Sequence, residues 1–114
     1  MDAGQQVTFE EFQRLRICVG TVIEALPNPR AKVPAYVLRI DFGRFGVRTS
    51  SAQITRHYTP QELVGFQVAA VMNFAPKRVA GVKSEVLVLG ALCEEGGVGL
   101  LQPSFRVPNG APVA

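Results

Sequence analysis

The sequence is poor in the residues that build metal sites, disulfide frameworks and membrane spans. It has no tryptophan and one histidine, and its two cysteines, Cys18 and Cys93, lie far apart without a CxxC motif. This spacing argues against a structural metal and for reduced thiols. No apolar run approaches the ~20 residues that a membrane-spanning helix needs. The first residues, MDAGQQ, do not resemble a signal peptide. We therefore expect a cytoplasmic protein without membrane insertion.

The sequence also lacks the residue combinations of common catalytic sites. The histidine, His57, has neither cysteine beside it, and the serines Ser50 and Ser51 are not part of a G-x-S-x-G motif. The carboxylates are scattered, and the glycines at 96–99 are not followed by the Lys-Ser/Thr of a P-loop. A Cys–His pair in space stays open, although most single histidines are structural or exposed. We expect a binding protein with no catalytic residue, metal or cofactor.

Length and composition favour one small β-rich domain over residues 1–114. Hydrophobic residues make up 47% and charged residues 18%, which is typical of a globular chain. Eleven glycines and eight prolines divide it into short elements, as in all-β folds. The net charge of +3, with most cations being arginine, permits polyanion binding without requiring it.

Two helix-start patterns predict two short helices. Thr8–Glu11 matches a capping box, in which the threonine and glutamate side chains each bond the backbone of the other, and Thr59–Glu62 is a second start with Thr59 as N-cap and Pro60 at the first helical position. The first helix carries Phe9, Phe12 and Leu15 on one side. A helix this short is marginal alone, so we expect its aromatic face to cap a barrel or to lie in a subunit interface.

Apolar and alternating segments predict strands over residues 16–26, 36–42, 47–53, 68–74 and 86–92, with a last short strand at 98–102. Gly20 indicates a bend or bulge in the first strand, and Gly43–Gly46 a hairpin turn. The third strand is polar, which indicates a groove or an edge. Five strands with a short N-terminal helix, a short helix between strands three and four, and a C-terminal extension are typical of the OB-fold barrel. Another small barrel would show the same periodicity.

The connection between the two most apolar strands carries three cations, Lys77, Arg78 and Lys83. Pro76 and Gly81 predict that the chain leaves one strand and enters the next through a loop. Loops held by rigid strands usually present binding groups. Taken alone, these residues fit a solvated loop equally well.

The two termini have different expected structures. Residues 1–7 are expected to be disordered, whereas residues 103–114 are too apolar to remain free and should pack on the body or on a partner subunit. Four apolar residues near the termini are either local core or dimer contacts, and a small barrel with apolar ends favours a two-fold interface. These residues are Phe9, Phe12, Phe105 and Val107.

Several segments resemble a known family. Residues 73–85, NFAPKRVAGVKSE, resemble the signature of the tRNA-binding OB domain, which occurs free-standing and appended to aminoacyl-tRNA synthetases. Residues 16–24, RICVGTVIE, resemble its first strand. Four further segments are closer to one branch, the CsaA-type secretion chaperones: AKVPAY (31–36), SSAQIT (50–55), SEVLVLG (84–90) and LLQP (100–103). The resemblance covers nearly the whole chain.

The resemblance implies an OB barrel, a homodimer and binding without catalysis. Its motif places tRNA contacts at Ser51, Asn73, Arg78, Ser84 and Glu85. Ala80 stands where many tRNA-binding relatives have a second basic residue, and Lys77 and Lys83 are candidates to compensate. This departure favours the chaperone branch. For that branch the resemblance implies binding of unfolded or pre-secretory polypeptides and contact with the export motor SecA.

Each candidate also has a plain structural interpretation. Ser50 and Ser51 either offer hydroxyls to a phosphate, a 2′-OH or a peptide backbone, or form an ordinary polar strand face. The Asn73 amide either binds a ligand or satisfies a neighbouring carbonyl, and Glu85 is expected to hold Arg78 or Lys83 in place. The candidate groove comprises Ser50, Ser51, Asn73, Lys77, Arg78, Lys83, Ser84 and Glu85. Three functions stay open: a protein-export chaperone, a binder of tRNA or other structured RNA, and a structural subunit of a larger complex.

Overall fold

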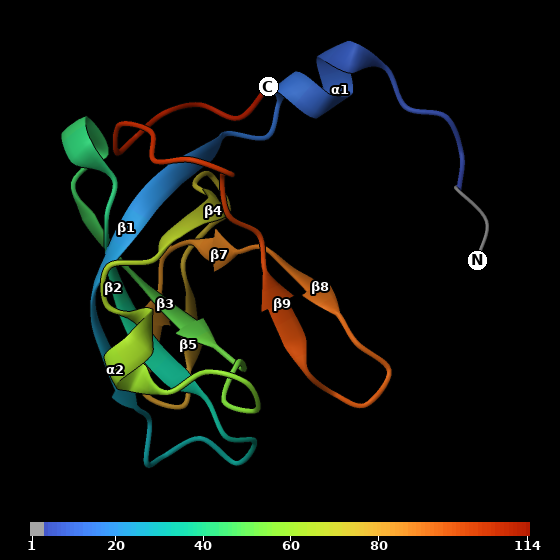
Figure 1. The fold of residues 1–114 in the computed structure, drawn as a ribbon. Helices are drawn as coiled ribbons and strands as arrows, with labels where there is room; N and C mark the ends of the chain where they lie inside the picture. Colours follow the sequence, from blue (N-terminus) through green and yellow to red (C-terminus); the bar gives the residue numbers. More distant parts are fainter. Residues whose placement is uncertain (1–3) are drawn as a thin grey trace.

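A computed structural model describes residues 4–114 of the protein (Figure 1). Its elements are, in chain order, α1 (Phe9–Gln13), β1 (Ile17–Pro27), β2 (Tyr36–Asp41), the 3-10 turn η1 (Gly43–Phe45), β3 (Val47–Ala52), α2 (Pro60–Leu63), β4 (Gln67–Val71), β5 (Lys77–Val79), β6 (Val82–Ser84), β7 (Leu87–Val88), β8 (Gly90–Leu92) and β9 (Val98–Leu100). No helix among these residues has the length and apolar character needed to cross a membrane.

A five-stranded antiparallel sheet forms most of the body, with the strand order β3-β2-β1-β4-β7. The long strand β1 pairs with β4 along its first half and with β2 along its second half. The sheet curls so that β3 and the segment after β6 lie side by side, joined by a hydrogen bond from Glu85 N–H to Thr49 O (2.8 Å). The prediction of an all-β, five-stranded OB-type barrel is confirmed.

The curvature of β1 comes from a register shift against β2, between Val22 and Glu24. Such a bulge bends and twists a strand. The sequence predicted the bend at Gly20, which has another role. A Cβ at Gly20 would lie 2.6 Å from Phe42 Cδ1 and 2.7 Å from Ile40 Cγ2. Gly20 is therefore the residue that lets β1 pack closely against the core side chains of β2.

The core fills the barrel with side chains from the inner faces of the strands. In the strand predicted over residues 36–42, the alternating apolar residues Tyr36, Leu38, Ile40 and Phe42 point toward the interior, and all four are buried. They pack with buried side chains from β1, β4, α2 and the segment before β7, namely Val22, Ala25, Leu63, Val68, Ala70 and Val86. This core fixes the register of β2 and β3. The register in turn decides which side chains of these strands lie on the outer face.

The predicted single strand over residues 86–92 is two strands in different sheets. β7 pairs with β4, whereas β8 pairs with β9. Leu89 lies between them: its N–H donates to Ala69 O (2.9 Å) and its carbonyl accepts from Leu101 N–H (3.2 Å). The chain changes partner at this residue, and β8–β9 extends from the body as a separate hairpin (Figure 1).

Both predicted helices are present, and the capping box predicted for the first is found at the start of each. Thr8 and Thr59 accept from the N–H of Glu11 and Glu62, whose carboxylates accept from the threonine N–H at 2.9 and 2.6 Å. The two helices differ in burial. α2 buries Leu63, but α1 buries none of its residues and extends from the top of the barrel (Figure 1).

The C-terminal segment packs on the body. Gly110 N–H donates to Val19 O (2.7 Å), Val19 N–H to Ala111 O (2.9 Å), and Val113 N–H to Ile17 O (2.8 Å). The segment thus continues the sheet along β1 beyond the end of β2. At the other terminus, residues 1–3 of the expected disordered stretch lie outside the described residues, and residues 4–7 form no helix or strand.

Candidate functional site

The segment with the three cations is a β-hairpin rather than the predicted loop. β5 and β6 pair antiparallel with Val79 opposite Val82, so two residues, Ala80 and Gly81, make the turn. Both have positive φ, 46° and 84°, as a type I′ turn requires. The sequence did not reveal the hairpin, because Ala-Gly replaces the usual Asn-Gly and each strand has only three residues.

The hairpin sorts its cations onto two faces. Arg78 lies opposite Lys83, so these side chains share one face, and Lys77 shares the other with Ser84. All three cations are exposed. The Nη1 atom of Arg78 donates to Gly81 O (3.3 Å), which holds the arginine beside the turn.

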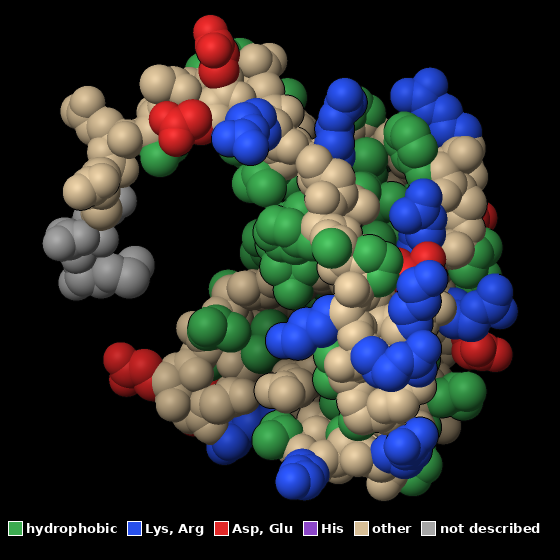
Figure 2. Space-filling view, turned by 180° about the vertical axis from the view of Figure 1, so that it is seen from behind, with side chains coloured by type: hydrophobic (Ala, Val, Ile, Leu, Met, Phe, Trp, Pro, Cys, Tyr) green, Lys and Arg blue, Asp and Glu red, His purple; other side chains and the backbone are tan. Residues whose placement is uncertain are grey.

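The cations of this hairpin are not neutralised by carboxylates. Within residues 4–114, the one ion pair joins His57 Nε2 and Glu95 Oε1 (3.2 Å), in a different part of the molecule. There, a backbone hydrogen bond and the bond to His57 lower the pKa of the Glu95 carboxyl below its ordinary value. Figure 2 shows many Lys and Arg side chains on one face, with few carboxylates among them. This surface has the charge that suits a polyanion.

Ser84 and Glu85 attach the hairpin to the edge of β3. Ser51 N–H donates to Ser84 Oγ (3.1 Å), and Thr49 N–H donates to Glu85 Oε1 (3.1 Å). These side chains therefore occupy edge groups that a neighbouring strand would otherwise satisfy. The expectation that Glu85 holds Arg78 or Lys83 is wrong, since its carboxylate bonds β3 instead.

The two predicted serines point in opposite directions. Ser50 pairs with Leu38 on the inner face and is only 1% exposed, and its hydroxyl donates to Ser51 O (3.4 Å). Ser50 is therefore not available to a surface ligand, which corrects its assignment to the groove. Strand alternation leaves Ser51 on the outer face, where it is half-buried opposite Val37.

A row of two apolar residues and one serine leads across the outer face to the hairpin. Leu26 lies opposite Val37, and Val37 lies opposite Ser51, so one residue from each of β1, β2 and β3 forms the row. Leu26 is 53% exposed. The row ends at Ser84, which accepts from Ser51 N–H. Sequence reasoning missed Leu26 and Val37, because only the strand pairing brings them together.

Asn73 has a structural position at the end of β4. Its Oδ1 atom accepts from Arg16 N–H (2.9 Å), and its Nδ2 atom donates to Arg14 O (2.8 Å). Both ends of the amide are thus occupied by the backbone between α1 and β1. The plain interpretation, in which this amide satisfies neighbouring backbone groups, describes the structure.

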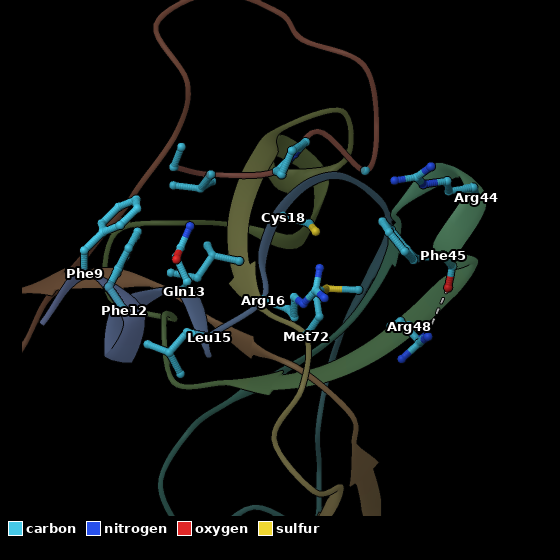
Figure 3. Close-up of a pocket in the computed structure, with 15 residues that line it drawn as sticks. Phe9, Phe12, Gln13, Leu15, Arg16, Cys18, Arg44, Phe45, Arg48 and Met72 are labelled. Atoms are coloured by element: carbon cyan, nitrogen blue, oxygen red, sulfur yellow. Dashed lines mark hydrogen bonds between the residues drawn. The ribbon is translucent and has the colours of Figure 1, made fainter.

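A second candidate surface is a cavity of about 720 Å³ between α1 and the barrel. The predicted dimer residues Phe9 and Phe12 line it from α1, facing Phe45 and Met72 of the body (Figure 3). Figure 2 shows a hollow with hydrophobic side chains at its floor. Phe9 is 69% exposed. A helix this short needs a packing partner, and the barrel alone does not supply one.

Three arginines also line this cavity: Arg16, Arg44 and Arg48. The guanidinium of Arg44 lies 4.9 Å from the centre of the Phe45 ring, and Arg48 Nε donates to Phe45 O (3.1 Å) (Figure 3). The cavity therefore combines an apolar floor with a cationic side.

The other two predicted dimer residues lie elsewhere. Phe105 is exposed and lines a smaller cavity of about 220 Å³ beside Phe66. Val107 is bonded through its backbone to the Gln67 side chain, with N–H···Oε1 at 3.0 Å and Nε2–H···O at 2.8 Å. The four residues thus divide into an α1 pair and a C-terminal pair.

The part of the chain that the structure describes contains no group of three His, Cys, Asp or Glu side chains able to hold a metal ion. The two cysteines are free thiols, with Cys18 buried and Cys93 exposed.

Comparison with known proteins defines the family. Residues 17–112 match the family described as "Putative tRNA binding domain", and the chain belongs to this family. It is similar over 96% of its length to the chaperone CsaA of Bacillus anthracis, covering 100% of that chain at 52% identity with a TM-score of 0.92. The CsaA chaperone of Picrophilus torridus is 43% identical, with the same coverage and a TM-score of 0.88.

The family also includes parts of much larger enzymes. The chain is 38% identical over 110 residues to the methionine–tRNA ligase of Porphyromonas gingivalis strain ATCC 33277. The aligned region covers 96% of this chain but only 16% of that enzyme. The resemblance to tRNA-binding domains and to CsaA chaperones drawn from the sequence is confirmed.

Proposed function

We propose that the protein is a homodimeric, non-catalytic chaperone of the CsaA type, which binds unfolded or pre-secretory polypeptides in the cytoplasm. The similarity to two CsaA chaperones over their entire chains supports this assignment. The export motor SecA is proposed as a partner on the family resemblance alone, and co-elution of purified SecA with the dimer tests it.

The observation that carries the polypeptide-binding proposal is the outer row of Leu26, Val37 and Ser51. An extended peptide laid across this face would place apolar side chains against Leu26 and Val37. The Ser51 hydroxyl can accept or donate a hydrogen bond to the peptide backbone. Leu26 is exposed and Val37 is half-buried on this face, and adjoining apolar side chains at the surface are typical of interaction sites.

The homodimer proposal rests on the cavity beneath α1. Phe9 and Phe12 cover an apolar recess without filling it, and α1 buries no side chain. A second copy that places apolar side chains in the recess would bury both aromatic rings. Phe105 and Val107, which lie away from this cavity in the C-terminal segment, are proposed to form a second contact of the dimer.

A comparison of two serine variants, one in the row and one outside it, tests the chaperone proposal. Leu26→Ser removes the most exposed side chain of the row, and Val64→Ser removes an equally exposed side chain, 51% against 53%, in the residue after α2. The measurement is light scattering by a chemically denatured client diluted into stoichiometric dimer. We expect the native protein and V64S to suppress aggregation and L26S to suppress it less. Aggregation at the client-only rate with native protein would end the chaperone proposal.

A second candidate function is binding of structured RNA such as tRNA. The observation that favours it is the β5–β6 hairpin, which exposes Arg78 and Lys83 on one face and Lys77 on the other, with no carboxylate partner for these cations within residues 4–114. Phosphate contacts make RNA affinity fall steeply with salt. We expect Arg78→Ala to weaken binding of all RNA sequences alike, because phosphate contacts carry no sequence information. Unchanged affinity in this variant would remove the RNA candidate.

A further inference from the structure

The β1–β2 loop is fastened to the turn of the β5–β6 hairpin. Asn28, which is only 9% exposed, donates from Nδ2 to Ala80 O (3.3 Å). Its Oδ1 atom accepts from Arg30 N–H (3.0 Å), and its backbone bonds Ala35 and Ala31. One buried amide thus organises the loop, joins it to the hairpin and fixes the backbone of Arg30. No sequence motif pointed to Asn28 or Arg30 as part of a site.

The Arg30 side chain lies against the hairpin turn. A Cβ on Gly81 would stand 2.8 Å from Arg30 Cζ and nearer still to Nη1, so the guanidinium occupies the space that any side chain at 81 would need. Arg78 reaches the same glycine from β5, through its bond to Gly81 O (3.3 Å). Two arginines from segments almost 50 residues apart in the sequence therefore meet at one backbone position.

This convergence places like charges together without a compensating carboxylate. The ion pair of the described residues involves neither arginine, and Lys83, opposite Arg78, adds a further cation. Neighbouring like charges are unfavourable unless an anion binds between them. A guanidinium offers paired N–H donors that match a phosphate, and an arginine already held against the backbone loses less freedom on binding.

We propose that Arg30 and Arg78 form a clamp for one phosphate group of an RNA backbone, with Asn28 and Gly81 as its positioning residues. This inference rests on the RNA-binding candidate above and is independent of the chaperone proposal. Arg30 would extend the cationic surface from the hairpin onto the β1–β2 loop, toward the outer face of the sheet, a common place for nucleic acid to bind OB-folds.

The test compares variants of equal charge for binding to unfractionated tRNA at several salt concentrations. Arg30→Gln should weaken binding about tenfold. It should also reduce the magnitude of the slope of log K against log salt by about one, because one counterion fewer is released. Arg106→Gln, which removes a guanidinium bonded to Gly65 O, should change affinity less than about twofold, as expected for a charge outside the contact. Arg30→Lys keeps the charge but loses the paired donors. Its affinity for tRNA should therefore be almost as low as that of Arg30→Gln.

Two further measurements test the clamp itself. Arg30→Gln and Arg78→Gln together should cost less than the sum of the single losses, because both side chains hold the same phosphate. Asn28→Ala changes no charge and should weaken binding about threefold by releasing Arg30, since misplaced contacts lose affinity. Thermal melting of each variant separates this effect from unfolding.

The outcomes separate the clamp from the broader functions. If R30Q and R106Q lose affinity equally, or if R30K binds like the native protein, Arg30 acts only through net charge and the clamp is wrong. If the native protein binds no tRNA but suppresses client aggregation, the clamp and the RNA candidate both fail while the chaperone proposal stands. If polyglutamate, rather than tRNA, shows the Arg30 dependence, the ligand is an acidic polypeptide and the RNA assignment is overturned.

Discussion

Glu85 and Thr49 exchange two hydrogen bonds at the point where the barrel closes. Glu85 N–H donates to Thr49 O (2.8 Å), and Thr49 N–H donates to Glu85 Oε1 (3.1 Å). A side chain thus replaces part of a strand-to-strand ladder. The residue that family resemblance connects with RNA contact holds the hairpin in place, so its loss should act through structure.

Glu85→Ala should therefore lower the free energy of unfolding by about 1–2 kcal/mol, because it leaves the half-buried Thr49 N–H without its acceptor. Chemical denaturation measures this change. Glu94→Ala, which removes an exposed carboxylate in the β8–β9 turn, is the matched control and should have little effect. Equal stability of both variants would show that the Glu85 bond does not stabilise the barrel.

Ala80 has a φ of 46°, a left-handed conformation that costs a residue with a Cβ about 1–2 kcal/mol. Asparagine tolerates this conformation and is the preferred first residue of a type I′ turn. We expect Ala80→Asn to raise the free energy of unfolding by about 0.5–1 kcal/mol. Ala75→Asn, at an exposed position before Pro76, should not. A drop in the melting temperature of A80N would contradict the turn geometry.

Gly20 is required by close packing rather than by backbone conformation. A Cβ there would lie within 2.7 Å of both Phe42 and Ile40 side-chain atoms. Gly20→Ala should destabilise the protein by about 2 kcal/mol through overpacking. Gly99→Ala is the control, since the nearest atom to its Cβ would be Ala91 O at 4.0 Å. Thermal melting measures the stability of the two variants. Equal melting temperatures for G20A and G99A would show that the core rearranges to accommodate the added methyl group.

Phe9 should be central to self-association. Phe9→Ser removes an aromatic ring that is 69% exposed and lines the cavity beneath α1. We expect the variant to dissociate at concentrations where the native protein is a dimer, because the interface loses apolar area. Light scattering coupled to size-exclusion chromatography measures the mass. Phe74→Ser, with a ring that is 49% exposed outside that cavity, should stay dimeric. A native protein that elutes as a monomer would refute the homodimer.

The local elements were predictable because they depend on residues close in sequence. Each helix start depends only on a threonine N-cap and the three residues that follow it, and both helices begin after the predicted threonine. The alternation of Tyr36, Leu38, Ile40 and Phe42 similarly fixed the buried face of β2. The order of separate motifs was enough to identify the family.

The prediction of the site was less complete, because its residues depend on strand pairing. Two neighbouring serines cannot both face outward, yet which of them does depends on the pairing of β3 with β2. Asn73, Ser84 and Glu85 proved to bond backbone that is distant in the sequence. The hairpin itself was missed because its short strands contain little apolar periodicity.

The sequence by itself determined the fold class, the helix starts, the buried face of β2 and the presence of a basic segment near residues 77–83. Tertiary structure alone decided where that segment lies and which loop is bonded to it. The register shift in β1 sets the curvature, and the curvature brings the β1–β2 loop to the hairpin turn. Arg30 reaches Gly81, the glycine that Arg78 bonds within its own hairpin, because this closure of the barrel brings Asn28 of the loop within hydrogen-bonding distance of Ala80.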